Sequence, residues 1–194
     1  MATATRRRRY GIVGDIVRTA NPVFIIFAVG VPIGAYLYAF NFGSLAAQNF
    51  VHIMAGGLWT GIDLFMGFVL GPVLGGMDPR ERAAVFRRLI PRMTFLMPVI
   101  AGVTSTAGFQ LAERLGMLSL DRPWVVAALV ITALLTIQGF GLLLPNEIRI
   151  FRQLLSETPD VEKISRLGMM NAKLGGLQGV FQLAVIFTMA NIRF

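Results

Sequence analysis

The sequence predicts an all-α polytopic membrane protein with five transmembrane helices, on three observations. Hydrophobic residues make up 55% of the 194 residues and charged residues only 14%, whereas a soluble domain carries about 25% charged residues. Five stretches are long and apolar enough to cross a bilayer core, which takes about 20 helical residues. Basic residues gather in alternate connections between these stretches. Little chain remains outside them, so we expect residues 1–194 to form a single transmembrane domain.

The five stretches are continuous apolar runs with helical spacing of their polar residues. They cover residues 22–42, 48–74, 93–115, 124–144 and 174–192. A transmembrane β-barrel would instead show strands of about ten residues with alternating polarity. A soluble protein would need a polar surface around five such segments, and the chain is too short to supply it. The runs therefore indicate membrane-spanning helices.

The distribution of basic residues predicts a multi-pass protein of the cell membrane with its N-terminus in the cytoplasm and its C-terminus outside. Fifteen of the 18 lysines and arginines lie on one side, five before the first span, five between spans two and three, and five between spans four and five. Cytoplasmic loops carry such an excess. The net charge of +8 thus reflects topology and attraction to the anionic cytoplasmic leaflet. We expect no nucleic-acid binding, because no DNA-reading motif follows the arginines at 6–9.

The first 20 residues form a short basic segment, and residues 10–19 predict a helix that lies in the membrane interface. At the start of the second connection, Asp78, Pro79 and Glu81 form the pattern of a helix N-terminus with a capping box.

The chain contains no cysteine. Disulfides, thiolate metal sites and cysteine-held iron–sulfur clusters are therefore excluded.

The second span carries a stripe of functional side chains. His52 is the only histidine, and it begins the pattern H-x6-W-x-G-x-D. At roughly 100° per residue, one side of the helix holds Gln48, His52, Trp59, Asp63 and Met66. An ionisable residue at membrane depth is costly and indicates a function. His52 and Asp63 are eleven residues apart, or roughly 16 Å along a helix, so the two mark different depths of one face.

The fifth span carries a second polar stripe, formed by Asn171, Gln178 and Gln182, with Gly175 and Gly179 beside it. The glycines would let this helix approach span two or four closely. Polar side chains turn away from lipid because lipid offers no hydrogen-bond partner. We therefore expect spans two to five to form a four-helix bundle with a polar interior, and span one to be a peripheral helix. The alternative is that these polar groups only hydrogen-bond the helices together.

His52 has several possible roles. It could be a hydrogen-bonded core histidine, a ligand of haem or copper, or a group that transfers protons or contacts a quinone. A single histidine excludes bis-histidine haem within one chain. Met189, near the outer end of span five, is the candidate second ligand. A thioether together with an imidazole also suits Cu(I).

The residues around His52 resemble a known superfamily. The run H-I-M-A-G-G-L-W-T-G starts at His52, and three further residues match, namely Phe65, Leu70 and Pro72. This pattern resembles copper-resistance D-like membrane proteins and is similar to HemJ-type protoporphyrinogen oxidases, in which a histidine precedes a tryptophan by seven residues. The resemblance covers spans two and three. It implies a small helical bundle that handles copper or haem, with His52 as the haem ligand. The chain lacks the family's arginine soon after the tryptophan, so protoporphyrinogen oxidation is not carried over.

The leading prediction is a membrane protein that handles haem b or copper, alone, as a homo-oligomer, or with other subunits of a respiratory or redox assembly. The candidate cofactor-binding residues are His52, Trp59, Asp63, Gln178 and Gln182, and the candidate metal ligands are His52 and Met189. The alternative is a non-enzymatic transport or structural bundle with a proton or small-solute path lined by Asp63 and the inward glutamines. No nucleophile–base pair or carboxylate pair in the sequence indicates hydrolysis. Whether the chain is an enzyme of another kind stays open.

Overall fold

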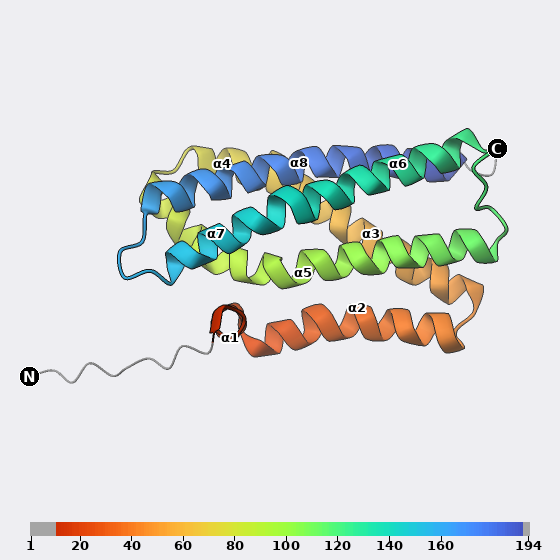
Figure 1. Cartoon of the computed structure of the whole chain (residues 1–194), viewed down its shortest axis with the longest axis horizontal. Coiled ribbons are helices and arrows are strands. Elements are labelled where there is room, and N and C mark those ends of the chain that lie inside the picture. The colour runs from red at the N-terminus through yellow and green to blue at the C-terminus, as the bar shows by residue number, and fades with distance from the viewer. Residues whose placement is uncertain (1–10, 192–194) are drawn as a thin grey trace, which may run out of the picture.

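The computed structural model describes residues 11–191, and this part of the chain consists of helices joined by short connections, without a strand (Figure 1). Five helical runs are long and apolar enough to cross a membrane, which confirms the predicted number of long apolar helices. They cover Pro22–Phe42, Leu45–Gly75, Pro79–Arg114, Pro123–Leu154 and Val161–Asn191. The arginines at 6–9 and the predicted end of span five at residue 192 lie outside the described residues.

Two of the five runs contain a π-helical segment. The second consists of α3 (Leu45–Leu64), η1 (Phe65–Leu70) and α4 (Gly71–Gly75), and the fourth of α6 (Pro123–Gln138), η2 (Gly139–Leu143) and α7 (Leu144–Leu154). A proline, Pro72 or Pro145, occupies the second position after each π segment. Proline has no N–H to donate to the preceding turn, and a local π adjustment satisfies the freed backbone groups. Such segments are frequent at functional sites.

The remaining spans are uninterrupted helices, α2 (Pro22–Phe42), α5 (Pro79–Arg114) and α8 (Val161–Asn191), and a short α1 (Gly11–Ala20) precedes them. The capping box is confirmed at the start of α5. The Asp78 carboxylate accepts from the backbone N–H of Glu81 at 3.1 Å, and the Glu81 carboxylate accepts from the N–H of Asp78 at 3.3 Å. α8 begins at Val161, so the helix of span five starts before its apolar run at residue 174 and includes the preceding polar residues.

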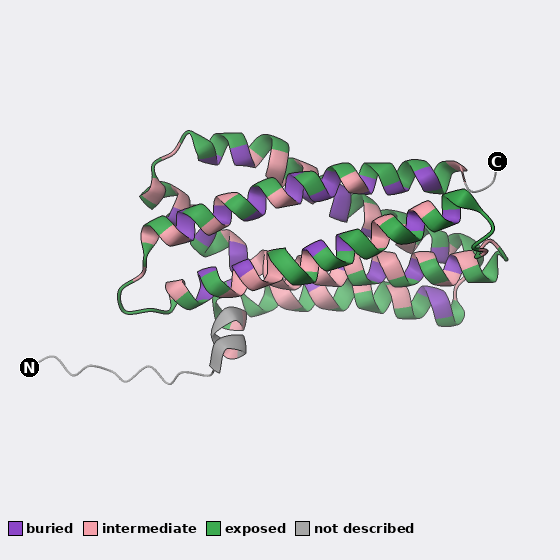
Figure 2. Ribbon diagram, turned by 45° about the horizontal axis from the view of Figure 1, so that its top comes forward, coloured by how far each residue is buried: buried purple, intermediate pink, exposed green. Residues whose placement is uncertain are grey.

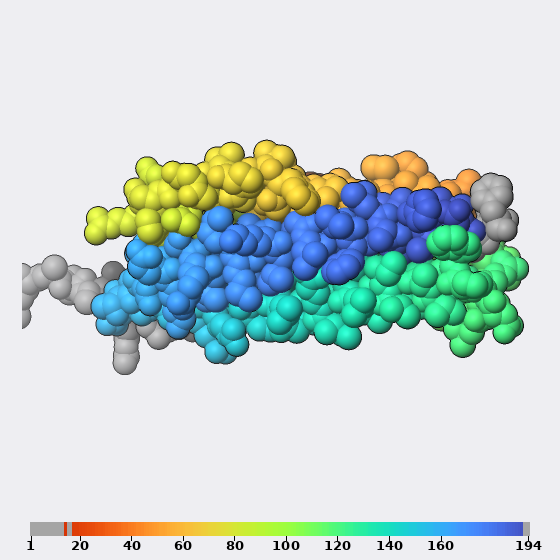
Figure 3. Space-filling view, turned by 90° about the horizontal axis from the view of Figure 1, so that it is seen from above, coloured from red at the N-terminus to blue at the C-terminus, as the bar shows by residue number. Residues whose placement is uncertain are grey.

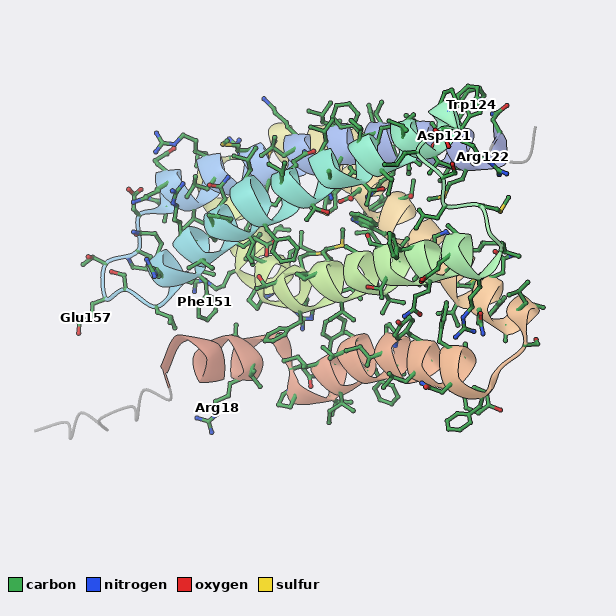
Figure 4. The ribbon with its side chains drawn as sticks, turned by 45° about the vertical axis from the view of Figure 1, so that its right-hand side comes forward. Arg18, Asp121, Arg122, Trp124, Phe151 and Glu157 are labelled. Carbon is green, nitrogen blue, oxygen red and sulfur yellow. The ribbon has the colours of Figure 1, made fainter. Side chains whose placement is uncertain are left out.

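The helices lie along the long axis of the molecule. Trp124, at the start of α6, lies at one end of the molecule. Glu157, in the connection between α7 and α8, lies at the opposite end (Figure 4). α8 packs against α3, η1, α5, α6 and α7, and α3 also packs against α5. Seen from above, α8 lies between the α3–α4 run and the α6–α7 run (Figure 3). α2 packs mainly against α5, α3 and α1, and α5 and α6 do not pack against each other closely.

Exposed residues on the outward sides of the helices are largely apolar, and buried residues face the neighbouring helices (Figure 2). Phe27 is 63% exposed and Phe42 is 81% exposed, whereas Asp63 is only 3% exposed. The buried polar side chains are Gln48, Thr60, Asp63, Gln138, Asn146, Ser165, Asn171, Gln178, Gln182 and Thr188. An apolar exterior around buried polar groups is what a lipid environment requires, so the fold is compatible with a multi-pass membrane protein.

Glycines allow α8 to lie directly against α3 and η1. A Cβ atom at Gly67 would overlap the backbone of Gly176. One at Gly179 would lie 2.8 Å from the Leu64 side chain, and one at Gly175 would lie 3.3 Å from Oδ1 of Asp63. The prediction that Gly175 and Gly179 bring span five close to its neighbours is therefore confirmed, with span two as the neighbour.

Candidate functional site

Asp63 is the central residue of the candidate site. Helical periodicity on α3 turns it toward α8, where Oδ2 accepts a hydrogen bond of 2.9 Å from Nε2 of Gln182. Both side chains are buried, with 3% and 2% of their surface exposed. Trp59, one turn earlier on α3, also interacts with Asp63 as a hydrogen-bond donor. A carboxylate has capacity for several donors, so these two neutral donors leave Asp63 able to interact with a proton or a cation.

A cavity of about 250 Å³ lies beside Asp63, between α3, α5, α8 and the α6–α7 run. Its polar lining consists of Asp63, Ser105, Thr106, Thr136, Glu147, Asn171 and Gln178. Its apolar lining includes Trp59, Met66, Met93, Met97 and Phe140. The described residues that line it include no lysine, arginine or histidine. The cavity therefore presents two carboxyl groups without a basic side chain to neutralise them.

The second carboxyl group belongs to Glu147, which the sequence analysis did not identify. Its Oε2 accepts a hydrogen bond of 2.8 Å from the Thr94 hydroxyl on α5. We had ended the apolar run of span four at residue 144 and expected its helix to continue as residues 146–156 in a cytoplasmic connection, which would contain Glu147. The structure confirms the continuation, since α7 runs to Leu154, and it adds that Glu147 faces the cavity. A signal was present, because Glu147 follows Thr136 by eleven residues, a spacing that returns to the same helical face.

Asp63 and Glu147 come from different helices and are close enough to interact electrostatically. Each lies next to a π segment, Asp63 two residues before η1 and Glu147 four residues after η2. Each is also held by one neutral donor from another helix, Gln182 or Thr94. Two carboxyl groups in one low-dielectric space repel each other when both are ionised. A proton or a cation between them would relieve this repulsion.

Side-chain amides tie the α6–α7 run to α8 around the cavity. Nδ2 of Asn146 donates to Oδ1 of Asn171 at 3.0 Å, and Nδ2 of Asn171 donates to the Leu143 carbonyl at 3.1 Å. Nε2 of Gln138 donates to the Leu174 carbonyl at 2.8 Å. These bonds cross between helices and satisfy buried amides. They hold α7, and with it Glu147, in a defined position against α8.

Gln178 is a buried side chain with unused hydrogen-bonding capacity. It is 3% exposed and lines the cavity, and its Oε1 has no hydrogen-bond partner within the described part of the chain. Oε1 of Gln182, one turn further along α8, has none there either. A buried acceptor without a donor costs free energy. A ligand that donates hydrogen bonds would remove this cost at Gln178.

His52 lies apart from the cavity. Its Nδ1 is 2.9 Å from the carbonyl oxygen of Thr104 on α5. A carbonyl can only accept, so Nδ1 carries the proton and neutral His52 presents a lone pair at Nε2. The ring packs against Gly108, where a Cβ would lie 2.6 Å from Cε1. We had expected His52 to share one interior with the span-five amides. It does not line the cavity that contains Gln178 and Asn171, because this part of the stripe faces α5.

The other predicted residues have different surroundings. Trp59 is buried, with 7% of its surface exposed, and lines the cavity one turn from Asp63. Gln48 is buried, and its Nε2 lies 3.5 Å from the Gly43 carbonyl. Met189 is 37% exposed on α8. The described residues contain no group of three or more His, Cys, Asp and Glu side chains that could hold a metal ion.

The cavity reaches the outer surface of the molecule between α5 and α6. Four of its lining residues are exposed, Gly102 and Thr106 on α5, Thr136 on α6 and Phe140 on η2. The gap arises because α5 and α6 do not pack closely against each other. In a membrane this surface would face lipid.

Comparisons of the chain with protein-family models, with curated proteins and with solved structures find no match. The similarity to copper-resistance D-like and HemJ-type proteins thus stays a prediction from the residues around His52.

Proposed function

We propose that this chain is a membrane transport protein that carries a proton or a small cationic solute through the cavity between Asp63 and Glu147. In this proposal the α3–α4 run, α5, the α6–α7 run and α8 form a four-helix bundle in the membrane, with α2 at its periphery. One observation carries it. Two carboxyl groups from different helices line one cavity, and no basic side chain among the described lining residues neutralises them.

The energetics of the bilayer support this function. An ionisable side chain within the hydrocarbon region is costly, and such residues mark ion pathways and proton relays. Asp63 and Glu147 are each oriented by a neutral donor, which leaves their charge uncompensated. The unpartnered oxygen of Gln178 adds an acceptor to the same wall. Carboxylate and amide oxygens together suit a cation or a hydrogen-bond donor.

The excess of basic residues supports an orientation for this protein. Fifteen of the 18 lysines and arginines belong to the N-terminal segment and to the connections before α5 and α8. We therefore assign these segments to the cytoplasm and the α5–α6 connection to the outside. Glu147, near the cytoplasmic end of its span, would then lie closer to the cytoplasm than Trp124 does.

Proton flux into vesicles tests the proposal. The purified protein is reconstituted into liposomes that contain a pH-sensitive dye, and a potassium diffusion potential is imposed. We expect Asp63→Asn and Glu147→Gln each to lower the flux roughly a hundredfold, the lower range of what a positioned proton-transferring group contributes. A parallel experiment measures uptake of labelled methylammonium, a small cation.

The matched control is Glu113→Gln, which neutralises an exposed carboxylate near the end of α5 that does not line the cavity. This variant should transport as the unmodified protein does. The proposal would be wrong if neither proton nor methylammonium flux exceeded that of protein-free vesicles. It would also be wrong if Asp63→Asn and Glu147→Gln both kept the full flux.

Haem b or copper binding at His52 is the second candidate function, and one observation favours it. Histidine ligands of metals usually donate their other ring nitrogen to a carbonyl or carboxylate, and Nδ1 of His52 is bonded in this way to Thr104. The fit is incomplete. His52 does not line the cavity, and no group of His, Cys, Asp and Glu side chains in the described chain supplies further ligands. Met189 is the expected partner in this reading.

A visible absorption spectrum and metal analysis of the purified protein test this second function. If haem is bound, His52→Ala should abolish the Soret band, because no other imidazole is present. Asp63→Asn, which changes the cavity and leaves His52 in place, should keep the band. A colourless, metal-free protein from haem-replete and copper-replete cells would rule this function out.

A further inference from the structure

A groove outside the cavity runs along α8 at the end that we assign to the cytoplasm. It has a volume of about 510 Å³. One residue of α5 and one face of α8 line it, namely Arg82, Glu162, Ser165, Arg166, Met169, Met170, Lys173 and Leu174. The α8 residues recur at spacings of three and four, as one side of a helix does. None of these residues lines the cavity beside Asp63.

The groove is positively charged and its cations are unpaired. Arg82, Arg166 and Lys173 stand against a single carboxylate, Glu162. Within the described part of the chain no hydrogen bond or ion pair engages the side chains of these three cations. The Nε of Arg82 is buried and has no hydrogen-bond partner there. A buried charged donor without a partner is costly, and a guanidinium matches a phosphate group with two parallel hydrogen bonds.

Apolar side chains line the same groove. Met169, Met170 and Leu174 line it beside the cations. Along the same helix toward the middle of the membrane, Met170 is 45% exposed and Leu177 is 48% exposed. An inorganic phosphate would use only the charged part of this surface. A ligand with a phosphate and a hydrocarbon chain would use both parts.

We propose that this groove binds one anionic phospholipid. Its phosphate lies between Arg82, Arg166 and Lys173, and an acyl chain lies over Met170 and Leu177. Basic pockets between transmembrane helices on the cytoplasmic side are suited to anionic headgroups. The inference is independent of transport, since the groove and the cavity have no lining residue in common.

Binding of phosphatidylglycerol to the purified full chain in a non-ionic detergent tests this site. Native mass spectrometry counts the retained lipids, and a titration gives the affinity. We expect Arg82→Gln and Arg166→Gln each to weaken binding about fivefold, the effect of one basic residue near an anionic surface. Met170→Gln should also weaken it without a change of charge. Phosphatidylcholine should bind more weakly than phosphatidylglycerol.

The matched control is Arg152→Gln on α7, which removes an exposed arginine that does not line the groove. It should leave the affinity unchanged. All variants are compared after size-exclusion chromatography, so that only folded protein is titrated. Equal affinity in Arg82→Gln, Arg166→Gln and the unmodified chain would overturn the proposal. Complete competition by millimolar inorganic phosphate would overturn the lipid as the ligand and indicate a phosphate site instead.

Discussion

Replacing Gly67 with leucine should prevent α8 from packing against η1 and so lower the yield of folded protein severely. A Cβ at this position would already overlap the backbone of Gly176. Backbone atoms cannot move aside as the end of a flexible side chain can, so the two helices would have to separate. Overpacking of a core costs about 1–3 kcal/mol and sometimes more. We expect Gly67→Ala to cost an amount in this range and Gly67→Leu to exceed it.

The measurement is the thermal unfolding temperature in detergent, followed by fluorescence-detected size-exclusion chromatography. Gly61→Ala and Gly61→Leu are the matched controls, because a Cβ at Gly61 on the same helical run meets no atom within 4 Å. These variants should unfold close to the temperature of the unmodified chain. If Gly67→Leu were as stable as Gly61→Leu, the close approach of α8 to η1 would be wrong.

Asp63→Leu should also destabilise the protein strongly, and more than Phe68→Leu on the same helical run. The change removes the acceptor of the buried Gln182 amide. A buried donor left without a partner costs about 1–3 kcal/mol. Phe68 is 62% exposed on the outer surface, and exposed substitutions usually stay within about 0.5 kcal/mol. Asp63→Asn keeps an acceptor oxygen and should be milder than Asp63→Leu.

A double-mutant cycle separates the hydrogen bond from other effects of the substitution. Asp63→Leu, Gln182→Leu and the combination are compared by thermal or denaturant unfolding in detergent. Residues in contact show coupling energies of about 0.5–3 kcal/mol, and we expect a value in this range for this pair. Additive effects, or equal tolerance of Asp63→Leu and Phe68→Leu, would show that Asp63 is not held by Gln182.

Several properties follow from the sequence because they depend on one segment at a time. The five long apolar helices follow from runs of apolar residues. The start of α5 follows from the local capping pattern at Asp78 and Glu81, which the structure reproduces. The burial of Asp63, Gln178 and Gln182 follows from helical periodicity together with the cost of exposing polar groups to lipid.

Tertiary structure alone decided which of these inward side chains meet. The partner of Asp63 depends on the rotation and axial position of α8 relative to α3, which the near contact of Gly67 and Gly176 determines. The same packing turns His52 toward α5 and away from the cavity. Glu147 entered the site because α7 packs against α8 and α5, where the Thr94 hydroxyl reaches its carboxylate. Hydropathy identifies a helix that can cross a membrane. It does not give the rotation and position of one helix relative to another, and these bring the two carboxyl groups to one cavity.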